Sequence, residues 1–434
     1  MMHKTTTSKD DLKNRNTIRI PIVSKFTIKI NLSAGKEINK LFLLIISLGI
    51  LLFIFQTSLI AATAKDSISW LKVPQEIQKN WKVTYSTEDL SVMTIKSTWS
   101  KDNSETSKKI YSIVPKKSSS YKMATAKLLE VLHIEGIPAE ITIINFAKKD
   151  ERGISILKQA EAEKVDLIFT MGSESAELVH KYYKGKKIPV VTCTNKDPVP
   201  LGQMKNYTEG SHNNIATTSL NVPLDIQLSY LFELVPELEN IGLMYNKNHK
   251  QVMATEVIPA KREFTKRNLN VIDVAVESRD TSKEKLKIII PQVINQMRKN
   301  DPQLKKSVFW ITSSTAIFSQ IKTINMYSDI VPVVSSIPNA VKKGDDSAVL
   351  AIGIDRRNNA HLASIYAVKI LRGEVKPGDL IVGIVTPPDV AINFRIAKKI
   401  GLKIPFRFFE SAAFIYDYEG EMVRSFGETV EKKK

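Results

Sequence analysis

Small polar residues follow the apolar runs of this 434-residue chain. In the first half, the runs at 165–171 and 188–193 precede Gly172, Ser173, Glu174, Ser175, Thr194, Asn195 and Asp197. In the second half, comparable runs precede Asn246, Ser313, Ser314, Thr315, Ser335, Ser336 and Asp355. Hydroxyl, amide and carboxylate groups at such places suit the binding of a small polar molecule.

Two of these loops offer complementary charges. Backbone N–H groups at Gly172–Ser175 stand where a strand turns into a helix and attract a carboxylate, and Asp197 offers a carboxylate to an ammonium group. Each residue also has a structural reading: Ser173 as an ordinary N-cap, and Asp197 as the stabiliser of a turn before Pro198. The second-half residues are equally suited to caps and turns.

The elements that must position these residues are parallel strands. Apolar runs of about five residues alternate with helical stretches, a pattern typical of strands covered on both faces. The pattern at 165–192 recurs at 307–336, which predicts two similar α/β lobes. Because ligands of open α/β sheets lie at the carboxyl ends of the strands, two such edges facing each other predict a cleft.

The motifs of catalysis are missing from the sequence. The six histidines lack metal-ligand spacing, and neither G-x-G-x-x-G nor a Walker A loop occurs. The single cysteine, Cys193, reads as a small buried residue, and Trp310 within its apolar run reads as core. We therefore expect a binding protein, not an enzyme, with no cofactor and no metal. The net charge of +18 is dispersed and no nucleic-acid motif accompanies it.

The N-terminal region has the features of an export signal. Residues 41–60 are apolar and uncharged, and the forty residues before them carry a net +6, which keeps the N-terminus cytoplasmic. Ala62-Thr63-Ala64 has the small-residue spacing of a signal peptidase site. The alternative is an uncleaved anchor formed by residues 41–60. Either topology places the rest of the chain in the periplasm or otherwise outside the cytoplasm.

Several stretches together resemble the ABC transporter substrate-binding proteins of the tryptophan/tyrosine-uptake type. They include Ile188–Val191 with Asp197–Val199, Ile241–Asn246, Ile330–Ser336, Gly353–Asp355 and Ala367–Glu374, within residues 109–405. The chain departs from the family where Arg356 and Arg357 replace the usual aromatic residue, and where Lys247 replaces the usual proline.

The resemblance implies a type I periplasmic-binding fold: two Rossmann-like, doubly wound α/β lobes with a ligand cleft between them. By this resemblance, lobe one is 109–224 plus 358–378 and lobe two is 225–357 plus 379–411. The leader (1–64), an N-terminal extension (65–108) and a C-terminal hairpin and tail (412–434) are expected from the residues themselves and lie outside the family's pattern. The resemblance also implies an amino-acid ligand, aromatic ones first, and an ABC permease in the inner membrane as partner. We expect a monomer. The alternative is a periplasmic sensor domain of the same fold that signals to a membrane partner.

Overall fold

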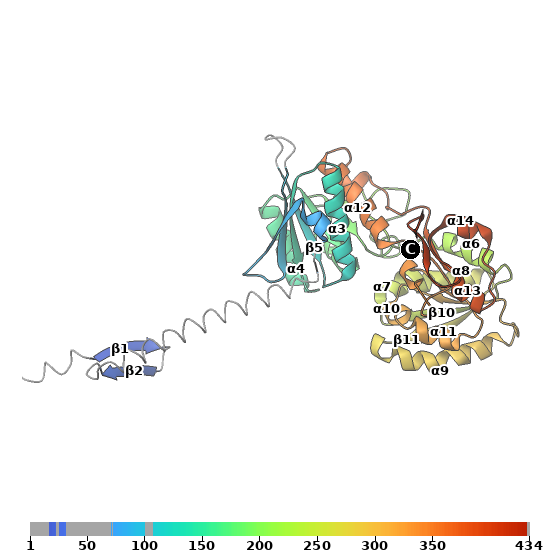
Figure 1. The fold of residues 1–434 in the computed structure, drawn as a ribbon. Helices are drawn as coiled ribbons and strands as arrows, with labels where there is room; N and C mark the ends of the chain where they lie inside the picture. Colours follow the sequence, from blue (N-terminus) through green and yellow to red (C-terminus); the bar gives the residue numbers. More distant parts are fainter. Residues whose placement is uncertain (1–16, 23–25, 32–70, 72, 100–106, 432–434) are drawn as a thin grey trace, which may run out of the picture. The chain divides into compact units, whose positions relative to one another are not determined.

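The computed structural model describes residues 17–22, 26–31, 71, 73–99 and 107–431 (Figure 1). The chain divides into two units, Met1–Ser67 and Ile68–Lys434. In the first unit, β1 (Thr17–Ile22) pairs antiparallel with β2 (Phe26–Asn31). The apolar run at 41–60 and the predicted cleavage site lie outside the described residues. Among the helices that are described, none is both long and apolar enough to cross a membrane.

The second unit contains two sheets, and the first of them has seven strands in the order β3-β4-β6-β5-β7-β8-β9. Its parallel part joins strands whose residues are mostly apolar and buried, as in β7, where all five residues are buried. The strands are β3 (Trp81–Tyr85), β4 (Val92–Ser97), β5 (Lys108–Val114), β6 (Ala139–Asn145), β7 (Leu167–Met171), β8 (Val190–Cys193) and β9 (Ile215–Thr217).

The segment before residue 108 supplies the antiparallel edge of this sheet. β3 pairs with β4, and β4 pairs with β6, both antiparallel. The sequence predicts strands at 82–85 and 91–95 within the extension, and β3 and β4 occupy these positions as the edge of the lobe-one sheet. A short helix, α2 (Gln75–Gln78), precedes them.

Helices cover both faces of the first sheet. One face packs against α3 (Ser119–Ile134) and α12 (Arg356–Leu371), which lie side by side in Figure 1. The other face packs against α4 (Asp150–Ala162) and α5 (Ser173–Tyr182). We call this body lobe one. α12 follows the strands β10–β14 in sequence, but its residues Ala360, Ala363 and Ala367 are buried in the core of lobe one. The chain therefore returns to lobe one after it has formed part of the second body.

The second sheet has nine strands in the order β11-β10-β12-β13-β14-β15-β16-β17-β18. Its first five strands are parallel, and β15 joins β14 antiparallel. The strands are β10 (Asn240–Asn246), β11 (Asn270–Val276), β12 (Ser307–Ile311), β13 (Val333–Ser335), β14 (Leu350–Gly353), β15 (Asp389–Asn393), β16 (Ala412–Tyr416), β17 (Met422–Ser425) and β18 (Glu428–Thr429).

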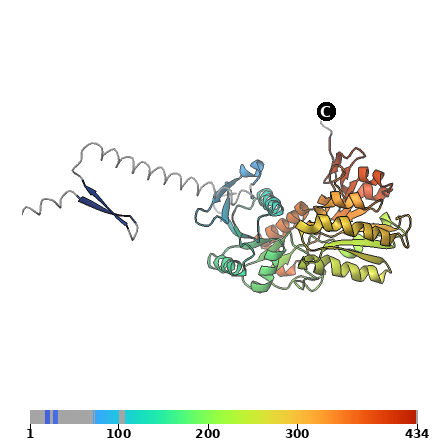
Figure 2. The same ribbon diagram turned by 90° about the horizontal axis from the view of Figure 1, so that it is seen from below.

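Helices also cover both faces of this second body, lobe two (Figure 2). One face carries α6 (Leu224–Leu234), α8 (Ile258–Lys266), α13 (Phe394–Lys399) and α14 (Phe406–Ser411). The other carries α9 (Arg279–Met297), α10 (Thr315–Phe318) and α11 (Ile321–Tyr327). The expected C-terminal hairpin is present as β16 and β17, with Gly420 at a φ of 85° in its turn.

The chain crosses between the lobes after β9, after β14 and again before β15. The sequence of residues 250–267 predicts one continuous helix, but the structure interrupts it. It comprises α7 (Lys250–Val252), the π-helical turn η2 (Met253–Val257) and α8. A π turn inserts one residue into a helix and is frequent at functional sites. The exact lobe boundaries given above stay a prediction.

Candidate functional site

The lobe-one side of the site begins where β7 turns into α5. Gly172 occupies the N-cap with a φ of 94°, a conformation that favours glycine. A Cβ at this position would collide with the hydroxyl group of Tyr121, which comes from α3. Ser173, the first residue of α5, accepts a hydrogen bond from the backbone N–H of Lys196 at 3.2 Å. The two predicted loops of lobe one are therefore in contact.

The loop after β8 holds two predicted residues with unpaired polar atoms. Thr194 has a φ of 52°, and its N–H donates to Asn359 Oδ1 on α12 at 2.8 Å. Thr194 Oγ1 and Asn195 Oδ1 are buried without a hydrogen-bond partner in the described part of the chain. Because a buried unpaired polar group is costly, these atoms are suited to contact with a polar ligand or ordered water.

Asp197 is held by its own lobe. Its Oδ1 accepts from Val199 N at 3.0 Å and its Oδ2 accepts from Tyr207 Oη at 2.5 Å, while its N–H donates to Asn221 Oδ1 at 3.0 Å. Burial raises the pKa of Asp197, and the bonds from Tyr207 and Val199 oppose that rise. This geometry matches the turn reading of Asp197, since both carboxylate oxygens already have a partner.

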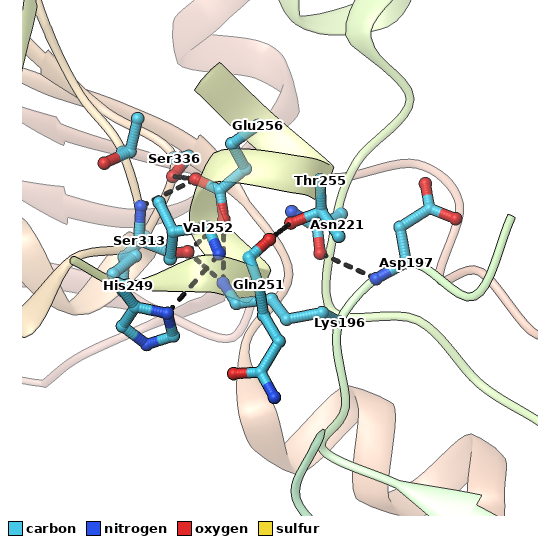
Figure 3. A network of polar contacts seen from close by, with 12 residues as sticks. Lys196, Asp197, Asn221, His249, Gln251, Val252, Thr255, Glu256, Ser313 and Ser336 are labelled. Carbon is cyan, nitrogen blue, oxygen red and sulfur yellow. Dashed lines mark hydrogen bonds and ion pairs between the residues drawn. The ribbon is translucent and has the colours of Figure 1, made fainter. Parts of the chain in front are cut away.

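The lobe-two side is built around Glu256, a residue in the π-helical turn (Figure 3). Ser313 N donates to Glu256 Oε2 at 2.7 Å, and the Ser313 hydroxyl donates to Oε1. Ser336 Oγ donates to Glu256 Oε2 at 3.3 Å. Two predicted residues from the ends of β12 and β13 thus converge on one carboxylate.

A charged contact joins the two lobes at this carboxylate. Lys196 Nζ lies 2.7 Å from Glu256 Oε1 and also contacts the hydroxyl of Ser313 (Figure 3). The side chains are only 13% and 8% exposed. Burial acts to raise the pKa of Glu256, but Lys196 and the bonds from Ser313 outweigh it, so this pKa lies below its usual value.

His249 borders the cluster formed by Lys196, Glu256, Ser313 and Ser336. Its Nδ1 accepts from Val252 N at 3.4 Å and so caps α7 (Figure 3). Burial lowers the pKa of His249, and the nearby Lys196 lowers it further, against the influence of Glu256 and Glu174. A neutral imidazole at neutral pH follows.

A pocket of about 570 Å³ adjoins Glu256 and reaches Asp197 and Asn221 in lobe one. Its lining combines apolar residues, including Leu224, Leu228, Leu243, Ala260 and Trp310, with charged ones, including Asp225, Arg262 and Glu263. Trp310 is 5% exposed, as expected of a core residue, and its ring centroid lies 5.2 Å from that of Phe264. A concave pocket that combines apolar walls with polar groups is a usual form of a small-molecule site.

The remaining predicted residues have structural partners or lie apart. Glu174 pairs with Lys148 at 2.7 Å, and Ser175 Oγ donates to Met171 O. Ser335 Oγ accepts from Ile337 N, and Asn246 Oδ1 accepts from Asn248 N. Asp355 caps α12 and Thr315 is exposed. Ser314 precedes α10, and its buried hydroxyl has no hydrogen-bond partner among the described residues.

The sequence reasoning missed Glu256, Lys196 and Tyr207. Glu256 lies in the π-helical turn, ten positions after the nearest predicted strand, so no strand-end pattern marks it. Lys196 stood in a predicted loop but was one of many lysines. Within the described residues, no group of three or more His, Cys, Asp or Glu side chains is arranged to hold a metal ion.

Two α/β lobes that contact each other through Lys196, Glu256 and Ser313 have the architecture of a two-lobed binding protein. The model of the ABC transporter substrate binding protein family matches residues 117–414, and the chain belongs to that family. It is a solute-binding protein of an ABC transporter, not an enzyme. Such proteins act outside the cytoplasm. No curated protein matches the chain in a sequence comparison.

Solved structures share the fold. The open, ligand-free structure of a substrate-binding protein with adhesive properties from Clostridium difficile has a TM-score of 0.55 and 22% identity, covering 70% of this chain and 98% of that one. An ABC domain in complex with L-Trp from Streptococcus pneumoniae has a TM-score of 0.53 and 20% identity, covering 70% and 99%. A conserved domain protein from Vibrio cholerae has a TM-score of 0.54 and 18% identity, covering 71% and 100%. The expected type I periplasmic-binding architecture is thereby confirmed.

Proposed function

We propose that the protein captures an amino acid, aromatic ones first, in the cleft between its lobes and delivers it to an ABC permease. One observation carries this proposal: the lobe-two cluster already holds an ammonium group. Lys196 Nζ is bound by Glu256 and Ser313 in a buried position. The ammonium group of an amino acid has the same charge and the same three donors, so Glu256 is its natural receptor.

The preference for an aromatic side chain rests on the pocket beside Glu256. Trp310, Leu243 and Ala260 give it an apolar wall large enough for a ring. The structural neighbour from Streptococcus pneumoniae contains L-Trp. The two lobes close when one ligand contacts both of them. A ligand shifts the open–closed equilibrium only by its differential affinity for the two states, and contacts to both lobes form only in the closed state.

The test is a thermal-shift panel of all twenty amino acids on the purified chain lacking residues 1–64. An amino acid that binds the folded state should raise the melting temperature by several degrees at saturation. Mass spectrometry of a ligand that copurifies would identify it directly. A flat response to every amino acid, with a different molecule copurifying, would refute the amino-acid assignment.

We further propose that the leader directs export and that the mature chain begins at Lys65, after Ala62-Thr63-Ala64. Intact-mass measurement of the protein released from the periplasm checks this. A membrane-bound form that retains residues 41–60 would show an anchor in place of a cleaved signal.

A further inference from the structure

Arg356 is placed at a position that disfavours a positive charge. It is the first residue of α12, a helix of 16 residues, and no acidic residue stands in the first turn of that helix. The N-terminus of a helix carries a partial positive charge, so a cation there is destabilised. The neighbouring residue, Arg357, is also a cation in the first turn of α12, but its charge is paired.

Arg357 is engaged by its surroundings. Its Nε lies 3.3 Å from Asp355 Oδ1, and its guanidinium group stacks on the ring of Phe426, 3.5 Å from the ring centroid. The residue is exposed. Its charge is therefore both paired and hydrated.

Arg356 is less exposed than Arg357 and is unpaired. Within the described part of the chain, no hydrogen bond or ion pair reaches its guanidinium group, and the residue is partly buried. Burial lowers its pKa, and Asp355 and Tyr121 oppose that change only through longer-range electrostatics. The group nevertheless stays charged, because arginine does not lose its proton in proteins.

The surroundings of Arg356 come from both lobes. A pocket of about 360 Å³ lies between Ser119, Ser120 and Met123 of α3 and Asn339, which precedes β14, and Asp355 also lines it. Arg356 lines it, and Arg357 borders it with its guanidinium group turned to Phe426. Tyr121, which acts electrostatically on Arg356, touches the Gly172 turn at the start of α5.

We propose that Arg356 binds a carboxylate group of the ligand. A partly buried guanidinium group without a protein partner gains from pairing, and a carboxylate offers it two parallel hydrogen bonds and an opposite charge. The inference rests on the proposed amino-acid function and refines it: Glu256 receives the ammonium group and Arg356 a carboxylate. That carboxylate belongs either to the α-carbon or to an acidic side chain.

The experiment compares the wild-type chain lacking residues 1–64 with Arg356→Gln, Arg356→Lys and Arg357→Gln by calorimetric titration. The probes are L-tryptophan, L-tryptophanamide, L-glutamate, succinate and inorganic phosphate. Arg356→Gln should weaken carboxylate binding thirtyfold or more, Arg356→Lys should restore part of it, and Arg357→Gln should change it less than threefold. L-Tryptophanamide should bind the wild type and Arg356→Gln equally. Whether L-tryptophan or L-glutamate suffers more from Arg356→Gln identifies which carboxylate is bound.

Melting temperature separates this role from a structural one. Because Arg356 is an uncompensated charge in the ligand-free protein, Arg356→Gln should melt at the same temperature as the wild type or higher. Unchanged carboxylate affinity in Arg356→Gln, or a lowered melting temperature without loss of binding, would overturn the proposal.

The two proposals can fail separately. If no amino acid binds the wild type, the amino-acid function is refuted, and succinate and phosphate then decide the role of Arg356. Binding of either anion to the wild type and to Arg357→Gln, but not to Arg356→Gln, would uphold an anion site. No binding of any anion to any form would overturn it.

Discussion

The ammonium group of Lys196 and the carboxylate of Glu256 lie 2.7 Å apart and join the two lobes of the protein. Lys196 follows β8 of lobe one, and Glu256 lies in the π-helical turn of lobe two. Replacing such a buried pair by well-packed apolar residues is often neutral, whereas removing one partner is expensive. The pair is therefore weak evidence for a role in stability, and it leaves room for our proposal that Glu256 receives a ligand ammonium group.

The first prediction concerns competition between Lys196 and the ligand. In Lys196→Met, the ligand ammonium no longer has to displace Lys196 from Glu256, so we expect the affinity for the amino acid to rise by about tenfold, or roughly 1.4 kcal/mol. The ligand-free protein should melt at a lower temperature, because Glu256 loses its partner. Glu256→Gln should lower the affinity thirtyfold or more, since a ligand charge is left unpaired.

Lys306→Met provides the matched control for this pair. Lys306 Nζ lies 2.9 Å from Glu239 Oε1, but both side chains are more than a third exposed. An exposed pair contributes about 0–1 kcal/mol, so affinity and melting temperature should stay near the wild-type values. Calorimetric titration together with thermal melting makes the comparison, and a weaker affinity in Lys196→Met would show that Lys196 helps to bind the ligand.

The second prediction concerns the Gly172 turn. Gly172→Ala places a Cβ at a positive φ and against the hydroxyl of Tyr121, so either the turn or the Tyr121 side chain must shift. Gly185→Ala shares the positive φ, at 78°, but its Cβ meets nothing within 4 Å. The control should lose about 1–2 kcal/mol from its backbone conformation alone. Gly172→Ala should lose more free energy of unfolding than the control, and its ligand affinity should also fall. Urea unfolding measures the first effect and titration the second. Equal losses in the two variants would show that Tyr121 yields without cost.

The repeated strand pattern made the lobes predictable. Buried parallel strands need uninterrupted apolar runs, so β7, β8, β12 and β13 all stand out in the sequence. The strand-end serines Ser313 and Ser336 were found for the same reason, because the carboxyl edge of a sheet is fixed once its strands are known.

The positions of several site residues could not be predicted from the sequence, because they depend on contacts between distant parts of the chain. Glu256 reaches the cluster through a π turn, which depends on tertiary packing and has no local signature in Met253–Val257. The partner of Asp197 oxygen Oδ2, Tyr207, lies ten residues away in a loop with no periodic pattern. Arg356 differs from Arg357 only in burial and pairing, which adjacent identical residues do not reveal in a sequence.

The third prediction is a pH dependence of stability that originates at His180. Burial of this residue in α5 lowers its pKa to about 4, with Lys184 contributing, and its Nε2 is buried without a partner in the described part of the chain. In the unfolded chain the pKa is about 6.5. The unfolded state thus binds more protons between these values, so stability is full above pH 6.5 and falls as the pH drops toward 4, by at most about 3 kcal/mol.

The test of this prediction is urea unfolding at pH 7.5, 5.5 and 4.5. His180→Phe should flatten the dependence between pH 6.5 and 4, because its ring carries no titrating group. His212→Asn serves as the control, since the His212 side chain is 74% exposed, and should keep the wild-type slope. A wild-type slope in His180→Phe would assign the pH dependence to other groups.

The fourth prediction concerns Asp197, the residue that the sequence left open between ligand contact and turn. Its two oxygens accept from Val199 N and Tyr207 Oη, so the carboxylate already has partners within lobe one. Asp197→Asn keeps the size of the side chain and an oxygen acceptor for Val199 N while removing the charge. We expect the affinity for the amino acid to stay within about threefold of the wild type. The melting temperature should fall slightly, because Tyr207 exchanges a charged acceptor for a neutral one, a difference of about 1 kcal/mol. Tyr207→Phe removes the same hydrogen bond from the other side and should lower the melting temperature by a similar amount.

Titration and thermal melting of both variants decide between the two roles of Asp197, ligand contact and turn. A thirtyfold or greater loss of affinity in a well-folded Asp197→Asn would return the ammonium group of the ligand to Asp197 and leave Glu256 to Lys196.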